Sequence, residues 1–272
     1  MNYFLSILAG IIQGLTEFLP VSSSGHLVIF HQLFNFDLSD NVLFDVVLHL
    51  GTLVALLLVF YRDVEKIIRG FISSLFNWNL SHNYNQHLAW LVIIGTIPAA
   101  IVGFFFENMI ETYFRSIYVV AGSLIIVAIL FFIFEKYSQR QKDVSQMSKV
   151  DALIVGLAQI LSFIPGTSRS GITIITSMGR GLKRDEAARF SFIMAMPIIF
   201  GAGLKKIFEI NQIADINITL LLLGFISSLV SGYLVIRFLL KFFKDHSLNI
   251  FAWYRLIIGF LILIWWTLFL GV

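Results

Sequence analysis

Six long apolar segments limit what this chain of 272 residues can fold into. Each has about the 20 residues that a helix needs to cross a bilayer. They cover residues 42–61, 88–106, 117–135, 190–206, 218–236 and 250–270. Only 13% of the residues are charged, against about 25% in soluble domains. We therefore expect an all-α polytopic membrane protein with six transmembrane helices.

Two further apolar stretches, 3–34 and 151–179, are interrupted near the middle by Pro, Gly and hydroxyl residues. The interruptions read LPVSSSGH and IPGTSRSG, and neither half of either stretch is long enough to cross a bilayer alone. A broken backbone at membrane depth is tolerated only where it is buried in protein or lines a cavity. We therefore predict two re-entrant helix–loop–helix hairpins.

The distribution of Lys and Arg predicts the orientation. The loops 62–87, 136–150, 180–189 and 237–249 hold three, four, four and three of the 19 Lys and Arg residues. Such loops face the cytoplasm by the positive-inside rule, so the first hairpin opens outward and the second inward. The cations are scattered over loops and form no single basic face, which argues against nucleic acid as a partner.

An internal repeat accompanies this inversion. GIIQGLTEFLPVSSSG (Gly10–Gly25) aligns with GLAQILSFIPGTSRSG (Gly156–Gly171) at a constant offset of 146, with six of sixteen positions identical. We predict one integral membrane domain, 1–272, built from an inverted repeat: residues 1–135 and 151–272, each one hairpin plus three spans, joined by the basic cytoplasmic loop 136–150. Such architectures place the binding site where the two hairpin tips meet.

The hairpin tips carry polar residues suited to an anion. A Gly- and Ser-rich break before a helix aims backbone N–H groups and a positive dipole end at one point, and an Arg fork beside them suits a phosphate. The predicted binding residues are Ser22, Ser24, Gly166, Thr167, Ser168 and Ser170, with Arg169 as the fork. A structural ion pair between Arg169 and Glu17 is the plainer interpretation.

Three residues of the first tip suggest catalysis. A carboxylate beside an anion site, here Glu17, holds a cation or moves a proton. Gln13 lies four residues earlier on the same helix face. It is either a second metal ligand or an amide that packs helices together. His26 follows the serines, and a neutral imidazole beside a hydroxyl makes an alcohol nucleophilic. A hydrogen-bonded core histidine is the alternative, and spacing does not decide which of the serines 22–24 attacks.

Asp45 and His49, four apart on the first span, could form a second polar layer. Arg255, like Arg169, lies within an apolar segment.

These residues also resemble a known family. QGLTEFLPVSSSGH (Gln13–His26) and PGTSRSG (Pro165–Gly171) are similar to the two signatures of the undecaprenyl-diphosphate phosphatases, the bacitracin-resistance proteins of bacterial inner membranes. FDVVLHLGTLVALLLVF (Phe44–Phe60) and ARFSFIMAMPIIFGA (Ala188–Ala202) resemble further segments of that family. The similarity extends over the whole chain.

The resemblance implies hydrolysis of a C55 polyprenyl diphosphate to the monophosphate and inorganic phosphate, in the cytoplasmic membrane, to recycle the lipid carrier for peptidoglycan. It also implies a magnesium or calcium requirement. The functional positions carried over are Glu17, Ser23, His26, Ser168 and Arg169, with Gln13 where the family has Glu or Gln. Because this chain has Gln at position 13, a metal bound by Gln13 and Glu17 would have one carboxylate ligand and not two.

We expect Ser23, activated by His26, to attack the terminal phosphorus on the external side of the membrane, while direct attack by His26 is the competing version. The rival class is an alternating-access transporter or lipid flippase for a phosphorylated substrate. A purely structural membrane protein is a weaker alternative. The oligomeric state stays open, a homodimer included.

Overall fold

The computed structural model describes residues 2–34, 41–114, 116–209 and 217–269. Over these residues the chain forms eleven α-helices and two short 3-10 helices, with no strand. The helices are α1 (Asn2–Phe18), α2 (Ser23–Phe34), α3 (Asn41–Val59), α4 (Tyr61–Phe76), α5 (Tyr84–Phe114), α6 (Ile117–Tyr137), η1 (Val144–Gln146), α7 (Lys149–Gln159), η2 (Ile160–Phe163), α8 (Arg169–Gly179), α9 (Arg184–Glu209), α10 (Ile218–Asp245) and α11 (Asn249–Phe269).

Six of the described helices are long and apolar enough to cross a membrane, as predicted. They correspond one to one to the six predicted segments, because hydropathy over about 20 residues is a local property of the sequence. The candidate spans are Asn41–Val59, Tyr84–Phe106, Ile117–Tyr137, Arg184–Lys205, Ile218–Asp245 and Asn249–Leu268. The chain is therefore a multi-pass, all-helical membrane protein.

Helix also fills parts of the chain that the sequence marked as loops. The sixteen-residue helix α4 occupies most of the predicted loop 62–87, α9 begins inside 180–189, and α10 continues to Asp245. In α4 the apolar residues lie on one face and the charged residues on the other. An amphipathic helix has a low mean hydropathy, so a search for spans does not find it.

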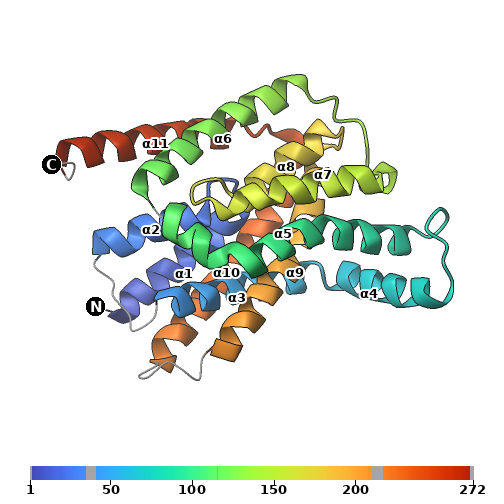
Figure 1. Ribbon diagram of the computed structural model, residues 1–272, viewed down its shortest axis with the longest axis horizontal. Helices are drawn as coiled ribbons and strands as arrows, with labels where there is room; N and C mark the ends of the chain where they lie inside the picture. Colours follow the sequence, from blue (N-terminus) through green and yellow to red (C-terminus); the bar gives the residue numbers. More distant parts are fainter. Residues whose placement is uncertain (1, 35–40, 115, 210–216, 270–272) are drawn as a thin grey trace.

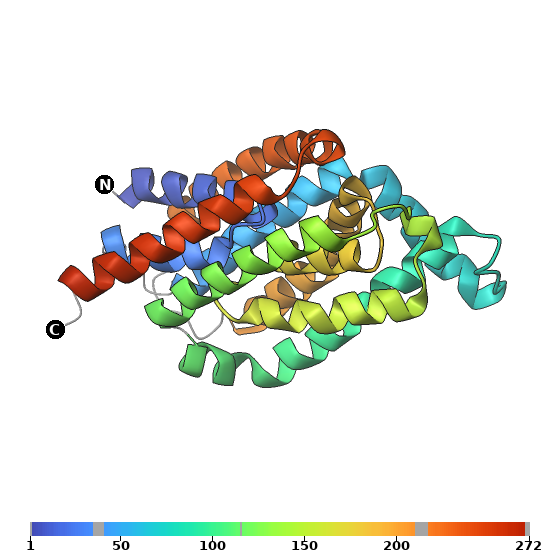
Figure 2. The ribbon, with the colours of Figure 1, turned by 90° about the horizontal axis from the view of Figure 1, so that it is seen from above.

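Both ends of the described chain lie at the same end of the molecule, and α4 lies at the opposite end (Figures 1 and 2). Helices α6 and α11 run side by side in both views. Helix α1 packs along α10, and α7 packs along α5. Each apolar stretch with an interruption is thus two helices, α1 with α2 and α7 with α8, broken at the predicted Pro- and Ser-containing segments.

Glycines allow the first helix of each broken pair to approach its neighbour closely. A Cβ added to Gly14 of α1 would lie 2.5 Å from the carbonyl oxygen of Ser228 on α10. A Cβ on Gly10 would meet the carbonyl of Gly224, and one on Gly156 of α7 would meet the carbonyl of Gly95 on α5. Small residues at helix contacts are the usual way for membrane helices to pack backbone against backbone.

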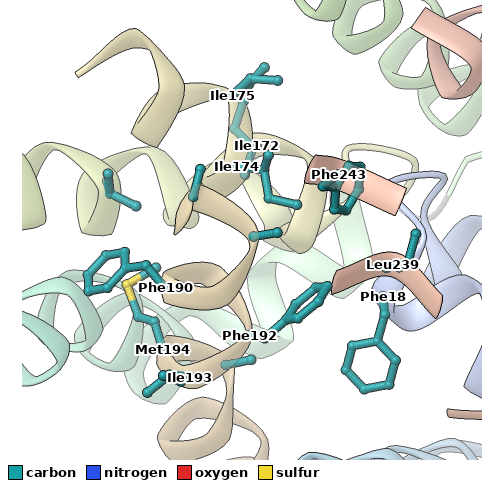
Figure 3. Close-up of a cluster of buried hydrophobic side chains, with 14 of the residues drawn as sticks. Phe18, Ile172, Ile174, Ile175, Phe190, Phe192, Ile193, Met194, Leu239 and Phe243 are labelled. Atoms are coloured by element: carbon teal, nitrogen blue, oxygen red, sulfur yellow. The ribbon is translucent and has the colours of Figure 1, made fainter. Parts of the chain in front are cut away.

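A hydrophobic cluster lies against α8, the helix that follows the second break (Figure 3). Figure 3 shows Ile172, Ile174 and Ile175 of α8 beside residues of α9, with Phe18 and Phe243 approaching from other helices. The rings of Phe18 and Phe192 meet edge to face, with centroids 5.4 Å apart, an arrangement that aromatic pairs prefer. This contact holds the end of α1, where Glu17 lies, against α9, which packs on α8, the helix that begins at Arg169.

A candidate active site at two helix breaks

The two breaks share one local geometry. Ser22 and Ser168 occupy equivalent repeat positions and have positive φ angles of 77° and 72°, a region that non-glycine residues seldom adopt. Ser22 Oγ accepts from the Gly25 N–H at 3.3 Å, and Ser168 Oγ accepts from the Gly171 N–H at 3.1 Å. Each serine therefore caps the start of the following helix.

This capping changes the expected roles of Ser22 and Ser168. Besides its backbone bond, Ser22 Oγ lies 3.3 Å from Ser24 Oγ, and Ser168 Oγ lies 3.2 Å from Ser170 Oγ. The hydroxyls are therefore engaged in holding the breaks. The groups that remain for a ligand are the N–H groups of the first two residues of each helix, Ser23 and Ser24 in α2 and Arg169 and Ser170 in α8, because the third is taken by the serine cap.

The Glu17 carboxylate is the meeting point of the two breaks. Arg169 Nη2 donates to Glu17 Oε1, so the ion pair considered from the sequence is present. Ser23 Oγ donates to Glu17 Oε2 at 2.6 Å, and Gln13 Nε2 donates to the same oxygen at 3.0 Å. Ser23 and Arg169 are the first residues of α2 and α8, so both helix starts converge on one buried carboxylate.

Two buried polar atoms around Glu17 have no hydrogen-bond partner among the described residues. They are Arg169 Nη1, a donor, and Gln13 Oε1, an acceptor. Buried polar atoms are nearly always hydrogen bonded, so an unpaired donor and an unpaired acceptor at one carboxylate indicate a ligand site. A guanidinium N–H suits a phosphate oxygen, and an amide oxygen suits a hard cation or water.

Among the described residues no hydrogen bond joins His26 to Ser23, so the expected serine–histidine pair is not formed in this structure. His26 Nδ1 lies 2.7 Å from the Ser22 carbonyl oxygen and Nε2 lies 2.7 Å from the Tyr254 hydroxyl. A carbonyl only accepts, so Nδ1 carries the proton and Nε2 of the neutral ring accepts from Tyr254. The ring folds back onto its own helix, while the Ser23 hydroxyl turns to Glu17.

Residues of α3 add a polar layer that the sequence placed only loosely. His49 Nε2 lies 3.5 Å from Glu17 Oε2, and His49 Nδ1 lies 2.7 Å from the Asp45 carbonyl oxygen. Asp45 Oδ1 in turn pairs with His31 Nε2 at 3.0 Å. The polar pair at positions i and i+4 on an apolar span signalled this layer, but its contact with Glu17 depends on how α3 packs against α1.

The other predicted binding residues take different positions. Gly166 has a φ of 93°, and a Cβ there would meet the Val120 carbonyl, so its small size serves the packing of the break on α6. Thr167 and Ser170 are buried, whereas Ser24 is exposed. Ser170 Oγ lies 3.5 Å from the Leu19 carbonyl oxygen of the first break. The two breaks thus touch directly.

The described residues hold no group of three or more His, Cys, Asp or Glu side chains that could bind a metal ion. The oxygens available near the unpaired donor are those of Glu17 and Gln13 Oε1. Magnesium commonly takes only one or two protein oxygens and completes its shell with water and substrate phosphate. The donor set therefore fits a metal that binds together with a phosphate ligand, and not a closed protein cage.

The fold and these contacts define a multi-pass helical membrane protein with a carboxylate, a serine hydroxyl and a guanidinium gathered where two helices break. The chain belongs to the family described as "Bacitracin resistance protein BacA", whose model matches residues 6–261. It is 42% identical to an undecaprenyl-diphosphatase of Methanosphaera stadtmanae, over 97% of this chain and 98% of that protein. Undecaprenyl-diphosphatases of Desulforudis audaxviator and Chlorobaculum tepidum are 40% and 39% identical, over 97% and 95% of this chain and 98% and 95% of theirs.

Proposed function

We propose that the chain is an undecaprenyl-diphosphate phosphatase, which releases the terminal phosphate of undecaprenyl diphosphate and so recycles the lipid carrier for cell-wall synthesis. The observation that carries this proposal is the arrangement around Glu17. Arg169 Nη2 donates to the Glu17 carboxylate and Arg169 Nη1 has no acceptor among the described residues, while the Ser23 hydroxyl donates to the same carboxylate. The names of the relatives favour a phosphatase over a transporter or flippase. A transporter also has no need of a nucleophile beside a carboxylate.

We infer that the two broken helix pairs are re-entrant hairpins of an inverted repeat, 1–135 and 151–272. The equal φ angles and equal caps at Ser22 and Ser168 support this inference. The contacts of Gly10 with α10 and of Gly156 with α5 are a second, independent match between the halves. Hairpins entering from opposite faces would bring Ser23 and Arg169 together at the middle of the membrane.

Substrate binding, in this proposal, begins with the diphosphate. Arg169 Nη1 and the free N–H groups at the start of α8 would bind the terminal phosphate oxygens. The same groups would neutralise charge on the transferred phosphoryl group in the transition state. A phosphate bound to the Arg169 guanidinium would also weaken the ion pair between Arg169 and Glu17. The Glu17 carboxylate would then be a better proton acceptor.

The proposed chemical step uses Ser23 and Glu17. The Ser23 oxygen forms a bond to the terminal phosphorus, the bond to the bridging oxygen breaks, and undecaprenyl phosphate leaves with the bond electrons. Glu17 takes the Ser23 proton along the 2.6 Å hydrogen bond already present. Water then forms a bond to phosphorus and the bond to the Ser23 oxygen breaks, while Glu17 returns its proton to that oxygen. The protons of the attacking water leave with the inorganic phosphate.

His26 has a different part in this scheme from that expected. Its Nε2 accepts from Tyr254, so direct attack on phosphorus requires that hydrogen bond to open first. With the bond closed, His26 helps to hold the start of α2, because Nδ1 bonds the carbonyl of Ser22. The two versions leave different covalent products, phosphoserine or phosphohistidine.

A divalent metal, magnesium or calcium, belongs to the proposal, with Glu17 and Gln13 Oε1 as its protein ligands. When bound, it would supply charge neutralisation at the phosphate oxygens. We also propose the cytoplasmic membrane as the location, with the site open to the external side, because the loops richest in Lys and Arg belong on the cytoplasmic side.

Phosphate release from undecaprenyl diphosphate by the purified protein in micelles tests the proposal. We expect Ser23→Ala, Glu17→Gln and Arg169→Ala each to lower kcat by about 10²- to 10⁴-fold, and a chelator to lower the wild-type rate. Ser145→Ala, outside the site, is the control. Absence of phosphate release by the wild type would favour a transporter, and near-normal rates in all three variants would refute the site.

Acid treatment of the quenched reaction separates the two nucleophiles. A phosphorylated enzyme that survives acid supports Ser23, whereas one that is lost in acid and survives base supports His26.

A further inference from the structure

Arg255, in the second turn of helix α11, is fully buried and reaches both helix breaks. Its Nη1 donates to the carbonyl oxygen of Pro20 in the first break at 3.1 Å. Its Nη2 donates to the carbonyls of Gly166 and Thr167 in the second break at 2.8 and 3.1 Å. A longer contact of 3.4 Å joins Nη2 to the Ser123 carbonyl of α6.

The guanidinium is held by peptide dipoles and an aromatic ring. Its carbon lies 5.4 Å from the centre of the Phe131 ring, a distance typical of a cation–π contact. Within the described part of the chain, no carboxylate forms an ion pair with Arg255. A buried charge is costly and is seldom kept without a partner or a role, and here four carbonyl oxygens from three segments take the place of a counter-ion.

The bonds to Pro20 and Thr167 lie next to the reacting groups along the chain. Pro20 lies between Glu17 and Ser23, and Thr167 precedes Arg169 by two residues. A trans peptide places its N–H opposite its C=O. The bond from Arg255 to the Thr167 carbonyl therefore turns the Ser168 N–H away from the guanidinium.

We infer that Arg255 is a positioning residue that fixes the separation of the two breaks and so aligns Ser23 and Glu17 with Arg169. Its planar fork can reach several carbonyls in different directions at once. A lysine ammonium has three donors at a single point, so it cannot bridge the two breaks and α6 in the same way. This inference goes beyond the proposed reaction, because it concerns a residue that touches no reacting atom.

The first experiment measures alignment without catalysis. The chain has no cysteine, so spin labels can be placed on Leu15→Cys and Leu161→Cys, two exposed positions beside the breaks on α1 and η2. The distance distribution between the labels is then measured by pulsed electron resonance. We expect a narrow distribution with Arg255 in place and a broadened or shifted one in Arg255→Lys and Arg255→Met.

Phe251→Leu is the matched control for this measurement. Phe251 is a buried residue of the same helix, and its ring packs against Phe242 and Phe243 of α10. We expect it to lower the melting temperature while leaving the distance distribution as in the wild type. An unchanged distribution in both Arg255 variants would overturn the inference, whatever their activity.

The second experiment is kinetic and rests on the proposed phosphatase function. We expect Arg255→Lys to lower kcat by about 100-fold, the effect of misplacing reacting groups by about 1 Å, with KM changed less than about threefold because Arg169 remains. A kcat within twofold of the wild type would also overturn the inference. If the wild type releases no phosphate, the proposed function fails, while the distance measurement still decides the role of Arg255.

Discussion

At the scale of single residues, one carboxylate organises the site. Glu17 accepts hydrogen bonds from Gln13, Ser23 and Arg169, which come from three different helices. The sequence predicted that Glu17 and Arg169 would meet, because an embedded carboxylate and an embedded guanidinium each need a partner at bilayer depth. It could not predict the side-chain directions of Ser23 and His26, since the spacing allowed His26 to face the hydroxyl of any of the serines 22–24.

Gln13 offers a test of metal binding at this scale. Gln13→Glu would place a second carboxylate beside Glu17, which raises the charge of the donor set. We expect the variant to melt at a lower temperature than the wild type without metal, because the two carboxylates repel each other. Added Mg²⁺ should restore the melting temperature by mass action, with an affinity on the order of tenfold higher than in the wild type.

Gln159→Glu is the matched control, because Gln159 is the equivalent buried residue of the second half and lies near the Gly95 carbonyl. We expect that variant to lose stability with no recovery in Mg²⁺. Equal responses of the two variants to Mg²⁺, measured by thermal unfolding in detergent, would contradict a metal site at Gln13 and Glu17.

At the scale of helices, the breaks depend on close backbone contacts behind them. Helix α1 lies against α10 through glycines, and Gly166 lies against α6 with a positive φ. The position of both breaks was predictable, because Pro, Gly and Ser interrupt a helix through local backbone chemistry. The partners of α1 and α7 were not, since any apolar helix face can pack on any other in lipid.

Gly14→Ala tests the packing of α1 on α10. The added Cβ would lie 2.5 Å from the Ser228 carbonyl oxygen and 2.7 Å from the Gly232 nitrogen, so two backbones must separate. We expect a loss of about 1–3 kcal/mol in the free energy of unfolding, measured by thermal or denaturant unfolding in one detergent.

Gly122→Ala in α6 is the control, because a Cβ at Gly122 meets nothing within 4 Å. We expect it to be neutral or to stabilise by about 0.5–1 kcal/mol through the helix preference of Ala. Equal losses in the two variants would show that the contact of Gly14 with α10 carries no special weight.

At the scale of the whole molecule, the basic segments are joined by ion pairs that hold helix ends together. The buried Glu135 carboxylate accepts from Arg140 and Arg184 and from the Leu248 N–H. These contacts connect α6, α9 and the start of α11. Loop charge predicts that these segments lie on the cytoplasmic side, a prediction that stays open, while the identity of each ion pair came from the packed helices.

Cysteine labelling tests the orientation of the whole chain. Ser81→Cys and Thr219→Cys each place one thiol at an exposed position of a chain without cysteine. We expect a membrane-impermeant maleimide to label Thr219→Cys in intact cells and Ser81→Cys only after permeabilisation, because Ser81 lies in the basic segment 62–87. The opposite labelling pattern would reverse the proposed orientation and place the site on the cytoplasmic side.

The sequence by itself determined the six spans, the two helix breaks and the residues at their tips, because hydropathy and backbone interruption depend on neighbouring residues alone. Only the tertiary structure decided that His26 bonds Tyr254, that His49 approaches Glu17 and that Arg255 bridges both breaks. Each of these contacts joins helices far apart in the chain. In a membrane they are selected by the packing of particular surfaces, because hydrophobicity drives helices into the bilayer but does not choose their neighbours.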